Sequence, residues 1–273
     1  MKSLCIGDNH RDEIRDSLVV SLWEFMLDLE GKVAFISGAA QGIGSITAQK
    51  FVSEGAKVIA VDQQKDKLDL LSSKGKGSIY GIQADLGNEK EIEIAFKTGC
   101  EHFGGLDILL NCAVLRSNMP LKDLDEQSIT PALDVGIKGN ILCSKFSSEY
   151  MKKRGGGVIV NMSSFYARTP AKERIVYVAV KSATEGLTRA LAVELAEYNI
   201  RVNAIAPGPI LTDRRVELGH GKDGDMEKRY ENLLMKRFGR VEEIIETILF
   251  LVTEKSSYIT GQTIVVDGGI TIA

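Results

Sequence analysis

Three side chains have the types and spacing of an acid–base site. Ser164 closes an apolar run, Tyr177 follows thirteen residues later, and Lys181 stands four residues beyond the tyrosine. If residues 177–198 form a helix, Tyr177 and Lys181 lie one turn apart on the same face. A phenol is a weak base at neutral pH, and a nearby ammonium stabilises its phenolate. The spacing is therefore suited to proton transfer by Tyr177, with Ser164 holding the substrate oxygen.

The same spacing is also compatible with a protein that does no chemistry. Serines commonly close strands, and a tyrosine four positions before a lysine occurs on many helices. The pair alone therefore favours ordinary packing. The choice between chemistry and packing depends on what the rest of the chain provides.

The upstream segment from Val33 to Asp62 has the pattern of a dinucleotide-binding unit. It contains an apolar run, the turn SGAAQGIG, a helical stretch, and a second apolar run that ends in Asp62. Gly38 permits a tight turn, while Gly42 and Gly44 let the backbone approach a pyrophosphate at the helix N-terminus. A carboxylate about 20 residues further on is where such folds hold ribose hydroxyls. The alternative is a packing turn that binds no ligand.

Asp62 also bears on which dinucleotide binds. Its carboxylate would repel the 2′-phosphate of NADP. The residues directly after it, Gln63 and Gln64, are neutral, and the glycine turn contains no arginine or lysine. The sequence therefore predicts NAD as the cofactor, with NADP less favoured, unless Asp62 merely ends a strand.

Strand and helix patterns alternate along the rest of the chain. Seven short apolar runs are typical of buried strands; they are residues 32–38, 57–62, 81–86, 106–113, 156–164, 200–208 and 263–269. Stretches with helical periodicity separate them, and no Pro- or Gly-rich linker divides the chain. We therefore expect an α/β fold with a Rossmann-like doubly wound parallel sheet of about seven strands, helices on both faces, and a single domain over residues 27–273.

Composition excludes several function classes. With 34 basic and 37 acidic residues the net charge is −3, so the whole-protein field does not favour nucleic acid. No apolar run reaches the roughly 18 residues of a membrane span. The four cysteines and three histidines are scattered, which predicts no metal site and reduced thiols in a cytoplasmic protein. A Gly-x-Ser-x-Gly hydrolase elbow is also absent from the sequence.

Five motifs follow one another in a diagnostic order: SGAAQGIG, LLNCA, NMSS, YVAVK and APGPILT. Together they resemble the signature set of the short-chain dehydrogenase/reductase family, in its common single-domain branch, from about Leu27 to the C-terminus. The resemblance implies NAD(P)-dependent hydride transfer between a secondary alcohol and a ketone. It also implies that Ser164, Tyr177 and Lys181 are catalytic, and that the chain forms a tetramer or dimer.

The resemblance further assigns a set of cofactor contacts along the chain. They are Gly38, Gln41, Gly42, Ile43, Gly44, Asp62, Gln63, Asp85, Leu86, Asn111, Ala113, Tyr177, Lys181, Pro207, Gly208, Ile210 and Thr212. Asp85 and Leu86 match the family's adenine contacts. The segment from Pro207 to Thr212 matches the one that meets the nicotinamide carboxamide.

The sequence departs from the family pattern near the proposed site. Cys112 and Val114 replace an asparagine and a glycine, and Gly136 stands where the family commonly has an asparagine that is thought to hold a water in the proton path from lysine to solvent. Either water bridges directly, or Asn140 takes over one turn later. These departures keep a second hypothesis open, an NAD-binding homologue with weak catalysis that acts as a sensor or interaction module. The intact Ser164, Tyr177 and Lys181 argue against it.

The sequence leaves the substrate open. A sugar or polyol, a hydroxy acid, a steroid-like alcohol and a 3-oxoacyl thioester all fit the proposed reaction. The long charged segment after Thr212 is a candidate lid or a solvated excursion. Basic residues near the site, Arg116, Arg168, Lys172 and Arg174, are compatible with an anionic or polyhydroxylated substrate or with simple solvation.

Residues 1–26 are predicted to be an N-terminal extension that the domain does not need. Acidic residues precede the apolar stretch 17–27 and no small-residue cleavage site follows it, so it does not have the pattern of a secretory signal. A chain that begins at Met26 is expected to fold and to keep full turnover, as measured by circular dichroism and a steady-state assay. Loss of either property would show that the extension belongs to the domain.

Overall fold

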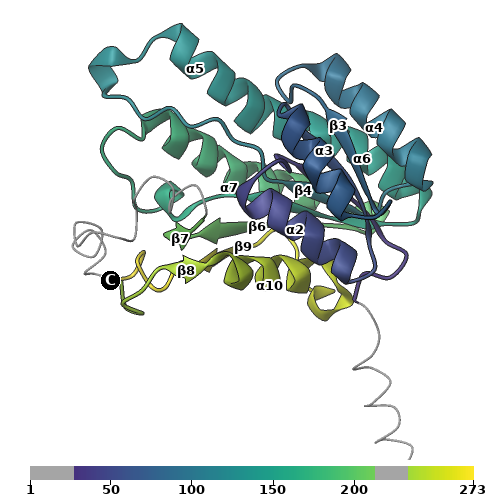
Figure 1. The fold of residues 1–273 in the computed structure, drawn as a ribbon. Helices are drawn as coiled ribbons and strands as arrows, with labels where there is room; N and C mark the ends of the chain where they lie inside the picture. Colours follow the sequence, from purple (N-terminus) through teal and green to yellow (C-terminus); the bar gives the residue numbers. More distant parts are fainter. Residues whose placement is uncertain (1–27, 213–232) are drawn as a thin grey trace, which may run out of the picture.

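A seven-stranded parallel sheet forms the centre of the protein (Figure 1). The computed structural model describes residues 28–212 and 233–273, so the proposed extension, residues 1–26, and residues 213–232 of the proposed lid lie outside the described residues. The strand order is β3-β2-β1-β4-β5-β6-β9. The strands are β1 (Val33–Ser37), β2 (Lys57–Asp62), β3 (Ile79–Gln83), β4 (Ile108–Asn111), β5 (Gly157–Met162), β6 (Ile200–Pro207) and β9 (Thr263–Val266). The expected single-domain, Rossmann-like fold is confirmed.

The strand order reverses between β1 and β4. From β1 the chain builds outward through β2 and β3, then crosses back so that β4 pairs with the other side of β1. The carboxyl ends of all seven strands lie at one edge of the sheet because every pairing is parallel. In open α/β sheets, such a switch point at the carboxyl edge is where ligands bind.

One strand begins two residues and ends three residues earlier than the sequence pattern indicates. The apolar run 81–86 predicts a strand there, but β3 ends at Gln83. The backbone N–H of Asp85 donates to Glu91 Oε2 at 2.7 Å, and the Asp85 carboxylate accepts from the N–H of Gly87. These local hydrogen bonds turn the chain out of the sheet toward the next helix.

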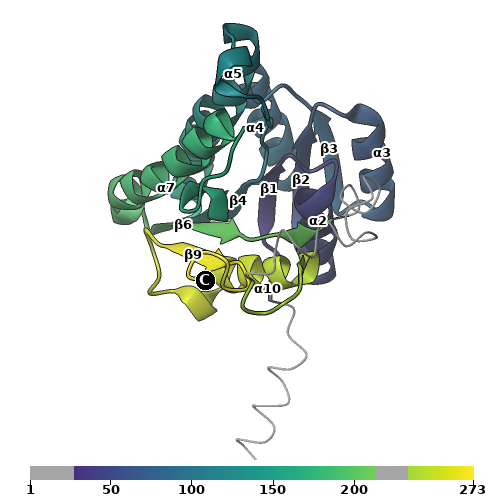
Figure 2. The same ribbon diagram turned by 90° about the vertical axis from the view of Figure 1, so that its left-hand side faces the viewer.

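Helices cover both faces of the sheet (Figures 1 and 2). One face packs against α2 (Gly42–Ser53), α3 (Lys65–Lys74) and α10 (Val241–Val252). The other packs against α4 (Glu89–Phe103), α6 (Gly139–Lys153) and α7 (Ile175–Leu195). The second core includes Phe35 stacked on Phe96, with ring centroids 3.9 Å apart. Each fully buried side chain of this size stabilises the fold by roughly 1.5–3 kcal/mol.

A π-helical turn interrupts the helix that precedes β5. Helix α5 (Glu126–Leu133) starts with a capping box between Asp125 and Ser128, turns π-helical over Asp134–Lys138, and continues as α6. A π turn inserts an extra residue into the helical register and often marks a functional position. Here it carries Gly136, which lies directly against Val180 of α7.

A second, two-stranded sheet lies beside the undescribed segment. The short strands β7 (Ile210–Leu211) and β8 (Gly239–Arg240) pair in parallel on either side of the undescribed segment. Within residues 28–212 and 233–273, no helix has both the length and the apolar character that crossing a membrane requires.

Candidate active site

The glycine turn packs tightly into the switch point of the sheet. Gly38 directly follows β1 and has φ +71°, a conformation that side-chain-bearing residues rarely adopt. A Cβ atom on Gly38 would lie 2.7 Å from the Cα of Ala113, beyond the end of β4. A Cβ atom on Gly44 would lie 2.3 Å from the Gly38 carbonyl oxygen. The turn therefore requires glycine at both positions.

The N-terminus of α2 offers an open anion site. Its N-cap residue, Gln41, makes no side-chain capping hydrogen bond, and its first turn, which includes Ile43, contains no acidic residue. Gly42 has φ +59°, and no heavy atom lies within 4 Å of the position a Cβ would take. Uncapped N–H groups and the helix dipole favour a negative charge here. The residues present fit a dinucleotide pyrophosphate.

Backbone donors hold the carboxylate at the end of β2. Asp62 accepts from the N–H of Ala40 at 3.2 Å and from the N–H of Gln64 at 3.1 Å. The intervening Gln63 uses its carbonyl to accept from the side chain of Gln83. A carboxylate fixed in this way is positioned to accept from ribose hydroxyls.

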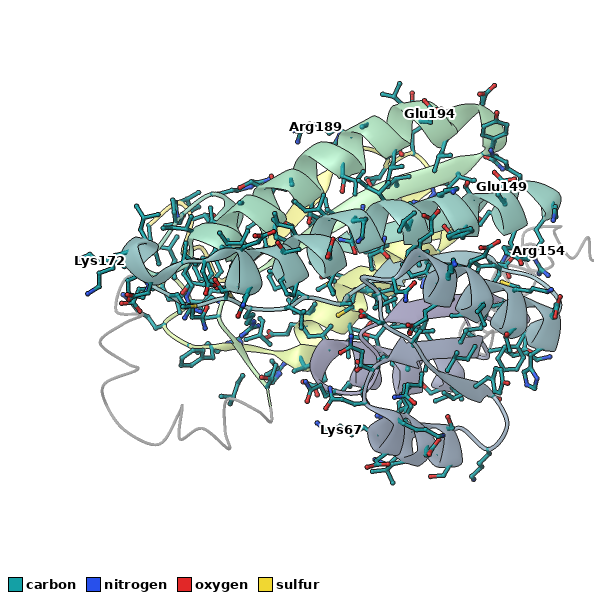
Figure 3. The ribbon with its side chains drawn as sticks, turned by 90° about the horizontal axis from the view of Figure 1, so that it is seen from above. Lys67, Glu149, Arg154, Lys172, Arg189 and Glu194 are labelled. Atoms are coloured by element: carbon teal, nitrogen blue, oxygen red, sulfur yellow. The ribbon has the colours of Figure 1, made fainter. Side chains whose placement is uncertain are left out.

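The fold also brings a cation to the glycine turn that the sequence argument did not count. Lys67 of α3, labelled in Figure 3, donates from Nζ to Gln41 Oε1 at 2.7 Å. The two residues are 26 positions apart in the chain, so only the folded structure reveals the contact.

The end of β4 is tied to the end of β1. The hydroxyl oxygen of Ser37 accepts from the N–H groups of Cys112 and Ala113 at 3.1 and 3.3 Å. Asn111 is 1% exposed and donates to Asn161 Oδ1 at 2.9 Å. The backbone of Ala113 therefore borders the glycine turn, whereas the Asn111 side chain points into the core between the strands.

The three proposed catalytic residues come from β5 and α7. Ser164 lies just beyond β5, and its hydroxyl accepts from the N–H of Tyr166 at 3.3 Å. The Nζ atom of Lys181 donates to the carbonyl of Met162, the last residue of β5, and lies 5.7 Å from the ring centroid of Tyr177. All three proposed residues are at least nine-tenths buried. The structure therefore brings them to the carboxyl edge of the sheet beside the glycine turn.

The environment of Lys181 is electrostatically unusual. Burial lowers the pKa of its ammonium, the proximity of Tyr177 raises it, and the positive charge of Arg116 lowers it further. An ammonium removed from water interacts strongly with nearby charge.

The remaining sequence-predicted cofactor contacts lie at the same edge. Asp85 and Leu86 follow β3, Pro207 ends β6, Gly208 comes next, and Thr212 follows β7. Leu86 is 5% exposed and Ile210 is 7% exposed, so both side chains belong to the core. A Cβ on Gly208 would lie 2.5 Å from the Cα of Asp267, so packing alone accounts for glycine at position 208.

No metal centre accompanies this arrangement in the part of the chain that the structure describes. There, no three His, Cys, Asp or Glu side chains are grouped as metal ligands.

Comparisons with known proteins identify the family and match the fold. A family model described as Enoyl-(Acyl carrier protein) reductase matches residues 38–271. A short-chain type dehydrogenase/reductase from Mycobacterium marinum has a solved structure that is 30% identical, covers 91% of this chain and 98% of that one, and superposes with a TM-score of 0.83. The chain belongs to the short-chain dehydrogenase/reductase family.

Two curated relatives show the range of activities within the short-chain dehydrogenase/reductase family. The 3-oxoacyl-[acyl-carrier-protein] reductase FabG of Thermotoga maritima is 36% identical over 89% of this chain and 99% of its own length. The NAD-dependent glycerol dehydrogenase of Listeria innocua is 34% identical over 90% of this chain and 96% of its own length. This short-chain dehydrogenase/reductase is thus related to oxidoreductases that act on alcohol or carbonyl groups.

Sequence reasoning missed several residues that shape the site. Tyr166 lies edge-on to Tyr177 with ring centroids 6.2 Å apart, and Ser163 donates to the Lys181 carbonyl at 3.1 Å. Ser37 bridges two strands, as described above. Tyr166 and Ser163 lie inside or beside the NMSS motif without a spacing rule of their own, so no sequence signal identifies them.

Gly136 is expected to be intolerant of even one methyl group. A Cβ there would lie 2.5 Å from Val180 Cγ1. Gly136→Ala should therefore lower the free energy of unfolding by about 1–3 kcal/mol, measured by urea denaturation. Adding Val180→Ala should restore much of that loss.

Gly186→Ala is the matched control on α7. The nearest atom to its Cβ position is Arg189 Nη2 at 3.9 Å, so this change should be neutral or stabilising, since alanine is the better helix former. Equal destabilisation by the two alanine substitutions would contradict the packing argument.

Lys181→Met is expected to abolish most activity while stabilising the fold at neutral pH. Burial lowers the pKa of Lys181 in the folded protein below the usual 10.5. At pH values between the two pKa values, the unfolded chain therefore binds more protons than the folded one. The penalty for the buried charge is therefore full at low pH and disappears as pH rises toward 10.5. Denaturation of both proteins from pH 7 to 10 should show a stability difference that shrinks with pH.

The control for Lys181→Met is Lys97→Met, which replaces an exposed lysine on α4. It should change neither turnover nor the pH dependence of stability. A Lys181→Met stability difference that stays constant or grows with pH would contradict the assigned cost of the buried ammonium.

Proposed function

We propose that this protein is an NAD-dependent oxidoreductase that interconverts a secondary alcohol and a ketone by hydride transfer. The observation that supports this most directly is the convergence of two sites at one sheet edge. The open helix N-terminus at Gly42 follows β1 at the point where the strand order reverses, and the buried Lys181 beside Tyr177 meets the end of β5, the strand next to β4. A cofactor bound along this edge would reach from the first site to the second.

In the proposed mechanism, Tyr177 exchanges the proton of the substrate hydroxyl. When bound, NAD supplies the acceptor for the hydride. Ser164 donates to or accepts from the substrate oxygen and fixes its position near the phenol. Lys181, which donates to the Met162 carbonyl and lies 5.7 Å from the centre of the Tyr177 ring, stabilises the phenolate and is also suited to hold a ribose hydroxyl. In the reductive direction, Tyr177 returns the proton to the forming alkoxide.

The preference for NAD rests on Asp62. Its carboxylate is held by two backbone N–H groups and so cannot easily turn away from an added phosphate. The name of the Listeria innocua relative supports the same preference. Lys67, held by Gln41, lies beside the glycine turn and lessens the local negative charge, so we expect NADP to be used weakly rather than excluded.

The second hypothesis, an NAD-binding module with weak catalysis, draws its main support from Gly136. The side chain that the family pattern places there is missing, and Asn140 donates instead to the Gly136 carbonyl at 2.9 Å. That contact keeps the Asn140 amide inside its own helix and does not provide a substitute directed at Lys181. Turnover distinguishes the two hypotheses.

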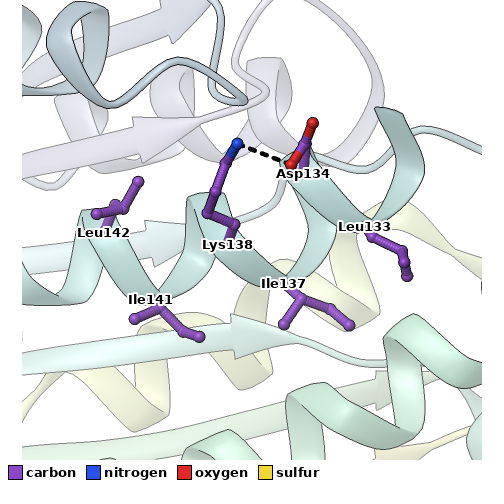
Figure 4. A pocket seen from close by; sticks show the side chains of 6 residues that line it. All are labelled: Leu133, Asp134, Ile137, Lys138, Ile141 and Leu142. Atoms are coloured by element: carbon purple, nitrogen blue, oxygen red, sulfur yellow. Dashed lines mark ion pairs between the residues drawn. The ribbon is translucent and has the colours of Figure 1, made fainter. Parts of the chain in front are cut away.

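An apolar groove of about 350 Å³ on α5 and α6 supports a homo-oligomer, either a tetramer or a dimer (Figure 4). Leu133, Ile137 and Ile141 line it, and the Asp134–Lys138 ion pair lies along its rim at 2.7 Å. Ile141 is 44% exposed in the single chain. A second copy covering this face would remove that apolar surface from water.

The free thiols are consistent with a cytoplasmic protein. Cys100, Cys112 and Cys143 form no disulfide. Burial raises the pKa of Cys100 and Cys143 to about 12, which makes them poor nucleophiles and keeps them in their reduced, packed form.

The test is a panel of secondary alcohols with NAD and with NADP, followed at the nicotinamide absorbance. We expect turnover with at least one alcohol, a preference for NAD, and a 10²- to 10⁴-fold loss of kcat in Tyr177→Phe with NAD affinity nearly unchanged. Near-normal turnover by Tyr177→Phe would refute the catalytic assignment. NAD binding without turnover of any substrate in either direction would favour the second hypothesis.

A further inference from the structure

A single guanidinium stands over the ring of the proposed catalytic tyrosine. The Cζ atom of Arg116 lies 5.7 Å from the ring centroid of Tyr177. Arg116 follows β4 on the segment that leaves the cofactor edge, and its side chain is exposed, whereas Tyr177 is 9% exposed. The cation therefore lies on the solvent side of the buried phenol, where a substrate would enter.

Other basic residues around this entrance already have partners or point elsewhere. Arg168 lies 3.5 Å from a carboxylate oxygen of Glu185. Arg174 donates to Asn118 Oδ1 and lies over the ring of Tyr166. Lys172 points away from the body of the protein (Figure 3).

Within the described ranges, Arg116 is held neither by a carboxylate, as Arg168 is, nor by an amide oxygen, as Arg174 is. Within residues 28–212 and 233–273, no carboxylate lies within 4 Å of its guanidinium, which lies over the face of the Tyr177 ring. Stacking on a ring restricts the guanidinium while its N–H edges stay free to form paired hydrogen bonds with a planar anion.

The charge balance at the site favours an anion there. Burial lowers the pKa of Lys181, and the Arg116 charge adds to that effect, so the field of Arg116 reaches the buried ammonium. Oxidised nicotinamide would add a further positive charge when bound. Within residues 28–212 and 233–273, no acidic side chain beside Arg116 offsets the positive charge of the entrance. A substrate with one negative group would offset it.

We infer that Arg116 binds a carboxylate of the substrate, and that the substrate is a hydroxy acid interconverted with its oxo acid. One guanidinium forms a bidentate pair with one carboxylate and balances its single charge, whereas a phosphate dianion would leave one negative charge unbalanced. Neutral polyols, uncharged steroid-like alcohols and simple thioesters offer no such group. The inference rests on the proposed function, because it places the carboxylate relative to a hydroxyl held at Tyr177.

The experiment compares short 2-hydroxy and 3-hydroxy acids with their uncharged primary amides, using the full-length protein and NAD. Wild type should favour one or more acids over the matching amide by at least about tenfold in kcat/KM. Arg116→Gln should lower kcat/KM for the acid by about 10- to 100-fold and leave the amide within about threefold, because only the charged hydrogen bonds are lost. Arg116→Lys should keep part of the preference.

Lys97→Gln controls for the loss of one positive charge far from the site and should leave both substrates unchanged. Equal loss for acid and amide in Arg116→Gln would overturn the inference, since it would show that Arg116 only supports Tyr177. Turnover of neutral alcohols with no preference for any acid would also overturn it and would leave the proposed function intact.

If no compound is turned over, the proposed function fails, and binding then decides the inference separately. Calorimetric titration of the NAD-bound protein with the same acids and amides should show at least tenfold tighter binding of an acid to wild type than to Arg116→Gln. Equal affinities would overturn the inference.

Discussion

The buried ammonium of Lys181 is the constraint around which the site is organised. Removing a lysine charge from water costs several kcal/mol unless a strong acceptor meets it, and here the acceptor is the Met162 carbonyl at the end of β5. That hydrogen bond joins α7 to the end of β5 at the site. Ser164 lies two residues beyond Met162, and Tyr177 lies one helical turn before Lys181, so the position of the ammonium determines both.

A buried chain of polar side chains sets the orientation of α7. Asn111 donates to Asn161 at 2.9 Å, Asn161 donates to Thr188 Oγ1 at 3.0 Å, and the Thr188 hydroxyl donates to the Thr184 carbonyl at 2.8 Å. An unpaired buried polar group costs roughly 1–3 kcal/mol, so α7 must present Thr188 to the strands. Thr184 and Lys181 occupy the same helical face as Thr188, which places the ammonium at the strand ends. The network therefore determines which face of α7 reaches Met162.

Local rules explain what could be predicted from the sequence. The glycine turn, Asp62 and the Tyr177–Lys181 spacing each depend on positions within one strand–turn–helix unit or one helical turn, and the apolar runs indicate buried strands wherever they occur. The order of the five motifs carried the family resemblance, and that resemblance implies the single-domain fold. The run 81–86 shows the limit of such rules, since side-chain hydrogen bonds around Asp85 moved the end of β3.

What the sequence could not provide depends on contacts between distant segments. Lys67 reaches Gln41 and Arg116 reaches Tyr177 because neighbouring strands deliver them to the same edge. No spacing within a single element encodes either contact. The motifs leave two properties open. The Lys67 contact bears on the discrimination between cofactors, and the Arg116 contact bears on the charge of the substrate.

The fit between Gly136 and Val180 bears on whether the departure from the family pattern signals a loss of catalysis. If Gly136 were a degraded position, the space of the missing side chain would be empty. Instead the Val180 methyl group occupies it, so that even a Cβ atom would be 2.5 Å away. Val180 directly precedes Lys181, so packing at Gly136 helps hold the lysine backbone in place. A small residue at 136 and a branched one at 180 thus form one packed arrangement behind an intact Ser164, Tyr177 and Lys181, which favours an enzyme with a modified proton route over a binding module.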